Sequence, residues 1–235
     1  MTAGVAVVVG VGPGLGFALV RRFARAGMAV AMAARDRDRL ERLLKAQPTD
    51  GASAFACDVT DKAEVDALFA QVDAEIGRPD LVVFNAGAFQ RSSVLDIDPA
   101  EFERCWRIGC LGGLLVGQAA ARRMVEAGHG TILFTGATAA LRGGAHFANL
   151  AVPKFGLRAL AQSMARELGP KGVHVAHVII DGQILSERYR HLEDQRGPDS
   201  LLHPDAIAET YYQLHLQPRS AWTQELDLRP WVEKF

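Results

Sequence analysis

Residues 6–17 read AVVVGVGPGLGF, and this stretch decides the fold class. Residues 6–9 form a short apolar run of the length of a buried strand. The run ends in a glycine-rich turn, and residues 17–26 then have the composition of a helix. Glycines let the backbone approach a pyrophosphate, and the free N–H groups of a helix N-terminus attract its negative charge. The four glycines of the turn are Gly10, Gly12, Gly14 and Gly16.

The spacing of these glycines separates two kinds of phosphate site. It runs Gly10-x-x-x-Gly14-x-Gly16, with Leu15 inside the turn. No Gly-Lys-Ser/Thr follows, so the stretch does not match a P-loop. The alternative is a tight strand–helix turn that binds nothing. Such a turn needs one or two glycines rather than four, so the pattern favours a dinucleotide site.

The composition fits one intracellular domain. The 235 residues with 49% hydrophobic content can build a large core. The net charge of −1 has both signs interspersed, which gives no electrostatic basis for binding nucleic acid or an anionic membrane. The cysteines form no C-x-x-C pair, no secretory leader is visible, and no uncharged apolar run reaches membrane-spanning length. We expect a reduced, cytoplasmic protein without a metal site.

Apolar runs alternate with helical patterns along the whole chain. The strands are continuous apolar runs rather than alternating ones, which is typical of a parallel sheet covered on both faces. Right-handed crossovers then give a doubly wound, Rossmann-type α/β fold in a single domain spanning 1–235. The expected strands are 6–9, 29–34, 52–57, 81–84, 131–135, 173–180 and 225–228. The expected helices are 17–26, 36–46, a stretch capped by Thr60 or Asp61 and running to about 76, then 99–127, 147–168 and 204–216.

Four motifs in this order resemble those of the short-chain dehydrogenase/reductase family, and the resemblance covers nearly the whole chain. It implies an NAD(P)-dependent oxidoreductase that binds its cofactor at the carboxyl ends of the strands. The glycine turn is the first motif, and Asp58-Val59 matches the acidic residue that contacts adenine. Asn85-Ala86-Gly87 matches the family's Asn-Ala-Gly, and Asp181-Gly182, with Ile184 just beyond, takes the place of its Pro-Gly.

The end of the second expected strand bears on the choice between NADP and NAD. An acidic residue there would accept hydrogen bonds from the adenosine ribose and repel a 2′-phosphate. The sequence has Ala34 at that place and Arg35 beside it, and a guanidinium pairs well with a phosphate. NADP(H) is therefore preferred, with NAD(H) possible. Asp36, an acidic residue next to Arg35, weakens this inference. NADP-binding members of the family often carry a second basic residue in the glycine turn, and this sequence has Pro13 near that place. The alternative is that Arg35 is only a solvated charge at the end of a strand.

The resemblance breaks at the active site. The family's chemistry implies a Tyr-x-x-x-Lys pair, whose lysine holds the nicotinamide ribose and lowers the pKa of the tyrosine. Lys154 matches the lysine, but Leu150 stands where the tyrosine belongs. Ala137 takes the place of the serine and Gly109 that of the asparagine. Leucine cannot transfer a proton.

Three residues besides Lys154 could replace the missing proton donor. His146 would share a face with Leu150 if the helix extends that far back. Thr138 adjoins the lost serine and Asn149 the lost tyrosine. Lys154 itself could donate if its pKa were depressed. Each also has a plain structural interpretation: an exposed residue at a helix start, a strand-end hydroxyl and a polar neighbour.

Two further segments bear on substrate and assembly. Residues 183–203 are polar enough for a flap or a surface helix, and the tail at 217–235 carries Trp222, Trp231 and Phe235, which could pack internally or cover a partner. The small residues of the expected helix 99–127 suit close helix–helix approach, so we expect a homodimer or homotetramer paired through this helix and 147–168. These small residues are Gly112, Gly113, Gly117, Ala119, Ala120 and Ala121.

The combined expectation is an NADP-binding short-chain-type oxidoreductase with an atypical active site and an unknown, apolar carbonyl or alcohol substrate. Two alternatives remain. One is a catalytically silent NADP-binding regulatory or assembly protein. The other is a non-redox enzyme, such as a lyase or isomerase, on the same fold.

Overall fold

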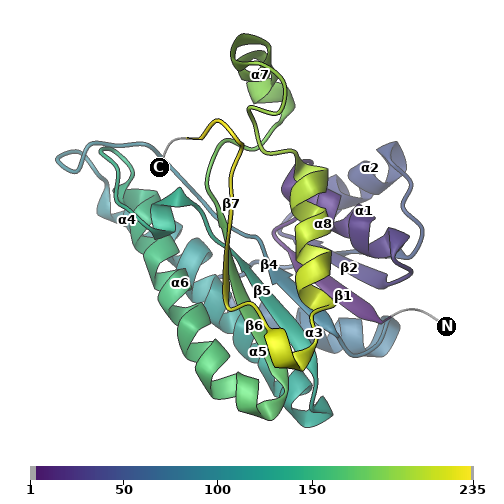
Figure 1. The fold of residues 1–235 in the computed structure, drawn as a ribbon. Helices are drawn as coiled ribbons and strands as arrows, with labels where there is room; N and C mark the ends of the chain where they lie inside the picture. The colour runs from purple at the N-terminus through teal and green to yellow at the C-terminus, as the bar shows by residue number, and fades with distance from the viewer. Residues whose placement is uncertain (1–3, 234–235) are drawn as a thin grey trace.

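A parallel sheet with helices on both faces forms the centre of the computed structural model, which describes residues 4–233 (Figure 1). The seven strands are ordered β3-β2-β1-β4-β5-β6-β7, and every neighbouring pair is parallel. This confirms the doubly wound α/β fold. The strands are β1 (Val5–Val9), β2 (Ala29–Ala34), β3 (Ala52–Ala56), β4 (Leu81–Phe84), β5 (Gly130–Thr135), β6 (Val173–Ile180) and β7 (Glu225–Leu228).

The helices form two layers, one on each face of the sheet. One apolar cluster joins the sheet to α1, α2 and α8, and the other joins it to α3, α5 and α6 (Figure 1). The α-helices are α1 (Leu15–Arg25), α2 (Arg37–Ala46), α3 (Lys62–Glu75), α4 (Pro99–Trp106), α5 (Gly112–Ala127), α6 (Ala148–Leu168), α7 (Arg190–Arg196) and α8 (Pro204–His215). Short turns of other helix types are η1 (Arg107–Leu111), η2 (Thr138–Ala140), η3 (Gly169–Lys171), η4 (Glu187–Tyr189) and η5 (Arg219–Ala221). None of the helices among residues 4–233 is both long and apolar enough to cross a bilayer.

The strand order fixes where a ligand can bind. The chain runs outward from β1 through β2 to β3, then returns to place β4 on the other side of β1. At this switch point the connections leave in opposite directions, which opens a crevice at the carboxyl ends of β1 and β4. The glycine turn follows β1, Asp58-Val59 follows β3 and Asn85-Ala86-Gly87 follows β4, so three of the four motifs meet at this crevice.

The expected helical stretch 99–127 is confirmed with the same bounds, and one π-helical turn interrupts its α-helical geometry. A π-helical turn, η1, separates α4 from α5, and Gly109 lies in it with its Cα facing Pro153 of α6. The glycines of α5 also pack inside the chain: a Cβ on Gly113 would stand 2.4 Å from Leu157 Cδ1. Ala119, Ala120 and Ala121 are buried as well. The small residues are therefore used within the chain and do not support the expected pairing of subunits.

The C-terminal aromatic residues have different environments. Trp222 stacks on His174 of the same chain, with ring centroids 4.9 Å apart, so it packs internally. Trp231 is 80% exposed. Phe235 lies outside the described residues. In the expected flap, residues 190–196 form the surface helix α7, which stands away from the sheet in Figure 1.

Candidate functional site: the crevice at the switch point

Two of the glycines in the turn serve the fold. Gly10 has a φ of +91°, and a Cβ there would lie 2.4 Å from the backbone nitrogen of Ala86. A Cβ on Gly16 would lie 2.8 Å from Val11 Cα. The amide of Asn85 donates a hydrogen bond of 3.0 Å to the Gly10 carbonyl. These contacts lock the ends of β1 and β4 together.

The other two glycines leave space for a ligand. A Cβ on Gly12 or Gly14 would meet nothing within 4 Å. Gly14 caps α1 without a side-chain hydrogen bond, and the first turn of α1, which begins at Leu15, carries no acidic residue. The partial positive charge at this helix end suits a phosphate. A dinucleotide pyrophosphate therefore fits this turn.

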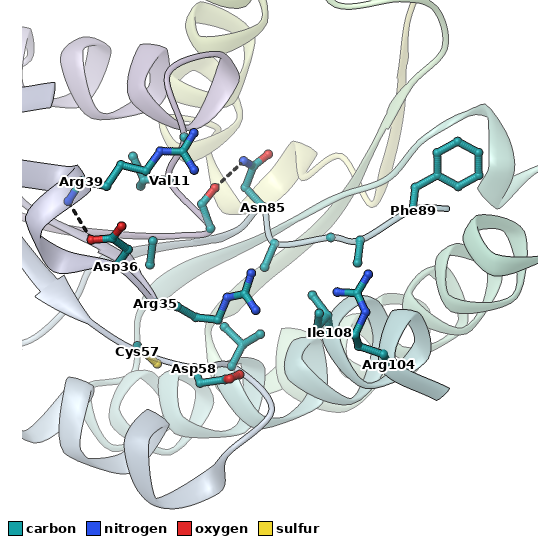
Figure 2. Close-up of a pocket in the computed structure, with 17 residues that line it drawn as sticks. Val11, Arg35, Asp36, Arg39, Cys57, Asp58, Asn85, Phe89, Arg104 and Ile108 are labelled. Atoms are coloured by element: carbon teal, nitrogen blue, oxygen red, sulfur yellow. Dashed lines mark hydrogen bonds between the residues drawn. The ribbon is translucent and has the colours of Figure 1, made fainter. Parts of the chain in front are cut away.

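The crevice has a volume of about 490 Å³. Figure 2 shows its walls, which come from the ends of β1, β2, β3 and β4 and from the α4–η1 region. The expected cofactor-binding residues in the lining are Gly10, Gly12, Arg35, Asp58, Val59, Asn85, Ala86 and Gly87. Gly14 lines a neighbouring cavity of about 240 Å³ together with Leu185 and Ser186 of the expected flap.

One end of the crevice is rich in arginine. Arg35 and Arg39 both line it, and Figure 2 shows both guanidinium groups directed into the space. Asp36, the acid that weakened the NADP inference, caps α2: its Oδ1 accepts a hydrogen bond of 2.9 Å from the Arg39 backbone N–H. Its Oδ2 lies 3.8 Å from Arg42. The Asp36 carboxylate thus serves as the N-cap of α2. Arg39 lines the crevice and was not predicted from the sequence.

Asp58 lies across the crevice from these arginines. Burial would raise its pKa, but the N–H and hydroxyl of Thr60 and the charges of Arg35 and Arg107 together hold the pKa below the usual value. The Thr60 N–H and hydroxyl donate to Oδ1 at 2.9 and 2.8 Å, so Oδ2 is left for another donor. An ionised carboxylate at this position can accept a hydrogen bond from an amino group.

The far wall contains residues that the motifs do not mark. Phe89 stacks on Phe147, with ring centroids 4.9 Å apart, and Arg104 is held by two hydrogen bonds to Glu101. Arg104 and Ile108 face the crevice from α4 and η1 (Figure 2). Arg104 and Ile108 are four residues apart, so the sequence predicts that they share one face of a helix. It does not indicate that this face of the helix meets the crevice.

Lys154 lies on α6 and is not among the residues that line the crevice. Its side chain is 7% exposed, and Nζ donates a hydrogen bond of 2.6 Å to the Thr135 carbonyl at the end of β5. Burial lowers the pKa of Lys154 from 10.5 to about 8. Lys154 therefore has the depressed pKa that a lysine needs to act as a proton donor near neutral pH.

The other proposed donors are less well placed. His146 precedes α6 rather than lying on it, because the helix begins at Ala148, so the condition for a helix face shared with Leu150 is not met. His146 is exposed and has a φ of +68°. Asn149 is buried, and its amide donates to the Gln90 carbonyl at 3.0 Å.

The hydroxyl of Thr138 donates a short hydrogen bond to Asp181, whose other oxygen lies 3.2 Å from Arg229. The proton of Thr138 is thus already directed at a carboxylate. A Cβ on Gly182 would lie 2.7 Å from Pro230 Cδ, and Ile184 pairs with Leu202 in an isolated bridge. These contacts fasten the loop after β6 to the C-terminal segment. No metal-binding group of His, Cys, Asp and Glu side chains is found among residues 4–233.

Comparison with known proteins agrees with this geometry. The family model described as short chain dehydrogenase matches residues 4–196. A 3alpha-hydroxysteroid dehydrogenase of Mediterraneibacter gnavus is 33% identical over 73% of this chain and 70% of its own length. A short-chain dehydrogenase structure from Rhodopseudomonas palustris is 38% identical, with a TM-score of 0.83 over 97% of this chain and 98% of that one. A metagenomic short-chain oxidoreductase solved in complex with NADP is 27% identical, with a TM-score of 0.84 over 99% of each chain. The chain therefore belongs to the short-chain dehydrogenase family of NAD(P)-dependent oxidoreductases.

Proposed function

We propose that this protein is an NADP(H)-dependent oxidoreductase that acts on an apolar carbonyl or alcohol substrate. The observation that carries the cofactor preference is the pair of guanidinium groups, Arg35 and Arg39, in one end of the crevice, while the Asp36 carboxylate beside them accepts a hydrogen bond as the cap of α2. Two guanidiniums can hold a 2′-phosphate through charge-assisted hydrogen bonds. The related oxidoreductase solved with NADP is consistent with this preference.

The rest of the crevice suits the other parts of such a cofactor. The open turn at Gly12 and Gly14 would hold the pyrophosphate, Asp58 with Val59 the adenine, and Lys154 the nicotinamide ribose. Asn85-Ala86-Gly87 would line the middle of the dinucleotide, with Gly182 and Ile184 at its nicotinamide end. The nicotinamide supplies or accepts a hydride when bound. The apolar side chains of Leu150 and Ala137, in place of a tyrosine and a serine, favour an apolar substrate.

The proton that accompanies hydride transfer needs a different source in this protein. Leu150, Ala137 and Gly109 carry no proton donor. Lys154, with a pKa near 8, is protonated in a large fraction of molecules at neutral pH and can release that proton. We assign it the acid role, with Thr138 and His146 as less suitable candidates because one is bonded to Asp181 and the other lies outside α6.

The presence of Leu150, Ala137 and Gly109 in place of the family's tyrosine, serine and asparagine also favours a second function. A protein that binds NADP(H) but does not catalyse hydride transfer would keep the glycine turn, the arginines and Lys154 while losing the tyrosine, serine and asparagine. Such a protein would act as a regulator or assembly partner that senses NADP(H).

Titration calorimetry with NADPH and NADH tests the proposed cofactor. We expect the unmutated protein to prefer NADPH. Arg35→Ala and Arg39→Ala should each cost about 1–3 kcal/mol of NADPH binding and little of NADH binding. Arg37→Ala is the matched control, because Arg37 is an exposed arginine of α2 that pairs with Glu41. Equal affinity of the unmutated protein for both nucleotides would contradict the preference.

Activity separates the two functions. Loss of reduced-nicotinamide absorbance with a panel of apolar ketones and aldehydes would establish the oxidoreductase. Tight NADPH binding without turnover on any carbonyl or alcohol would favour the silent protein.

A further inference from the structure

A second cavity lies at the amino ends of the strands, at the opposite edge of the sheet from the crevice. It has a volume of about 290 Å³, and its lining includes three histidines: His129 ahead of β5, His174 of β6 and His215 at the end of α8. His129 is exposed, His215 is half-buried and His174 is buried. Protonation of His174 and His215 therefore places charge inside the fold.

His174 contacts the chain just before β7. Its Nε2 lies 2.8 Å from the carbonyl oxygen of Thr223, which can only accept, so Nε2 carries the proton of the neutral ring. Nδ1 is then an acceptor, and it is buried without a hydrogen-bond partner among residues 4–233. The ring also stacks on Trp222, with centroids 4.9 Å apart and planes 3° apart. One buried imidazole thus contacts two consecutive residues of this segment.

Residues 216–224 connect α8 to β7, and we call them the connecting loop. The Gln217 side chain bonds to Thr223 twice: Oε1 accepts the Thr223 N–H at 2.7 Å, and Nε2 donates to its hydroxyl at 2.8 Å. The indole N–H of Trp222 donates to the Gln217 carbonyl at 3.2 Å. These bonds lie within the loop, so the loop can leave the sheet as a unit.

His174 and Arg219 attach the connecting loop to the amino edge of the sheet. Arg219 donates to the Gly128 carbonyl at 2.7 Å. His215, just ahead of the loop, has Nδ1 3.0 Å from the hydroxyl of Thr131 on β5. Thr131 is the cross-strand partner of His174, and such partners point to the same face of a sheet. The imidazoles of His174 and His215 are therefore neighbours on one face.

We infer that His174 and His215 form an acid-sensitive clasp, which holds the connecting loop and the edge strand β7 on the sheet at neutral pH and releases them when both imidazoles are protonated. Protonation puts two positive charges next to each other where water is largely excluded, near the guanidinium of Arg219. Opening of the loop separates these charges and hydrates them.

The surroundings of the two rings disfavour their charged forms. Burial lowers the pKa of His174 from the usual 6.5, and the carbonyls of Thr223 and Leu214 oppose this only in part. Burial also lowers the pKa of His215; Asp80 opposes this shift, and the charge of His174 adds to it. The other charged or titratable groups around the pair are His129, Arg166, Tyr212 and Arg219.

The sign of the pH effect follows from proton binding. Both pKa values lie below 6.5 in the closed clasp and return toward 6.5 in the open one, so the open form binds more protons on acidification. The clasp is therefore fully stable above about pH 6.5 and weakens as the pH falls through the folded pKa values. Two other titratable groups beside β7 change little above pH 5. Arg158 lowers the pKa of Glu225 below its usual 4.5, and burial lowers that of His177 to about 4.

β7 connects the clasp to the opposite edge of the sheet. Arg229, which follows β7, lies 3.2 Å from Asp181, and a Cβ on Gly182 would lie 2.7 Å from Pro230 Cδ. Release of β7 would therefore also loosen the loop 181–184 at the carboxyl edge. Its consequence for the cofactor rests on the proposed function, whereas the clasp itself does not.

Amide hydrogen exchange at pH 7.5 and pH 5.0, measured by NMR, tests the clasp. Dividing each observed rate by the rate of an unstructured peptide gives the opening equilibrium of that amide. We expect the opening of the amides in Glu225–Leu228 to increase by about tenfold or more at pH 5.0. In the double variant His174→Gln with His215→Asn, this pH dependence should be lost. Gln retains an amide at the place of Nε2 and Asn one at the place of Nδ1, so both variants keep a hydrogen-bonding group that does not titrate.

His191→Asn is the matched control, because His191 is an exposed histidine of α7. It should keep the pH dependence of the unmutated protein. If His174 and His215 served only to pack the edge, the double variant would open more at both pH values and retain the pH dependence. That result, or equal opening of β7 at both pH values in the unmutated protein, would overturn the clasp.

Histidine NMR provides the test should the double variant fail to fold. The chain has seven histidines, few enough to follow in one titration of the unmutated protein. We expect His174 and His215 to titrate with midpoints below 6.5, and His174→Gln should raise the midpoint of His215. Midpoints of 6.5 or above for both histidines would overturn the clasp. Neither measurement needs nucleotide, so a failure to bind NADPH would contradict the proposed function alone.

Discussion

Asp36 and Arg39 show how single side chains bear on the choice between NADP and NAD. An acid at the end of the second strand is an ambiguous signal in the sequence, because it could face the adenosine ribose or turn away. The structure resolves this through a helix cap, since Oδ1 of Asp36 accepts the Arg39 N–H. The helix was predicted to within one residue of its observed start, but nothing in the sequence indicates that Arg39 of its first turn meets the crevice.

Lys154 should make stability depend on pH in the alkaline range. Its pKa is about 8 in the folded protein and 10.5 when unfolded, a difference that corresponds to about 3 kcal/mol. Between these values the unfolded chain binds more protons, so the free energy of unfolding rises with pH. Urea unfolding without nucleotide should show the unmutated protein gaining about 3 kcal/mol over Lys154→Met from pH 7 to pH 10.5.

Lys171→Met is the control for this prediction. Lys171 is a lysine whose side chain is 48% exposed, so its replacement should not change the pH dependence of the free energy of unfolding. A constant difference between the unmutated protein and Lys154→Met across the same range would contradict the depressed pKa.

The missing tyrosine and serine can be restored in one variant. Leu150→Tyr combined with Ala137→Ser should raise the turnover of simple carbonyls by about 10²–10⁴-fold if the site is a disabled version of the family's, because a positioned general acid contributes that much. NADPH affinity should stay unchanged. The measurement is the initial rate of NADPH oxidation in the unmutated protein and the double variant. High activity of the unmutated protein that falls in the double variant would show instead that it has evolved a different chemistry.

At the scale of the element, the sequence predicted the strands and the extent of the long helical stretch, but not the π-helical turn inside it. Continuous apolar runs placed the seven strands to within a residue or two. The stretch 99–127 has helical composition throughout, and its glycines indicated only that packing would demand small residues. Nothing in this composition predicts the π-helical turn η1, where Gly109 meets Pro153 of α6, a residue from a distant part of the chain.

The close packing of α5 on α6 gives a stability prediction. A methyl group on Gly113 would stand 2.4 Å from Leu157 Cδ1, so Gly113→Ala should destabilise the protein by about 1–3 kcal/mol through overpacking. Chemical denaturation measures this loss. In a Leu157→Ala background the added methyl group has space, and the cost of Gly113→Ala should be smaller or reversed.

Gly169→Ala is a control for this prediction. Gly169 follows α6, has a φ of −53° and would place a Cβ with nothing within 4 Å. Its replacement should change the free energy of unfolding by less than about 0.5 kcal/mol. Equal losses for Gly113→Ala in both backgrounds would show that the contact with Leu157 is not the cause.

At the scale of the whole molecule, the order of motifs along the chain was enough to predict the sheet and the location of the crevice. Parallel strands with right-handed crossovers leave few topologies, and a glycine turn after the first strand selects the doubly wound one. The reactive end of the site was less predictable. Lys154 comes from α6 and the Thr135 carbonyl that accepts its hydrogen bond from β5, and only the folded chain brings them together.

The expected homo-oligomer now depends on a different set of residues. The small residues of α5 are buried inside the chain, but Trp106, Val152 and Phe155 on the neighbouring helices α4 and α6 are 38%, 45% and 43% exposed. Large apolar side chains that stay exposed on adjoining helices are typical of a surface that another subunit covers. We predict a dimer or tetramer that pairs through the outer face of α4 and α6.

Phe155→Glu tests this pairing. A carboxylate in an apolar interface is left without a partner, so the variant should weaken association by about tenfold or more and shift the mass measured by light scattering toward the 25.4 kDa of one chain. Leu216→Glu is the control, because Leu216 is 53% exposed at the end of α8, on the other face of the sheet, and its replacement should leave the mass unchanged. A single-chain mass for the unmutated protein at micromolar concentration would contradict the assembly. An oligomer insensitive to Phe155→Glu would place the interface on another surface of the protein.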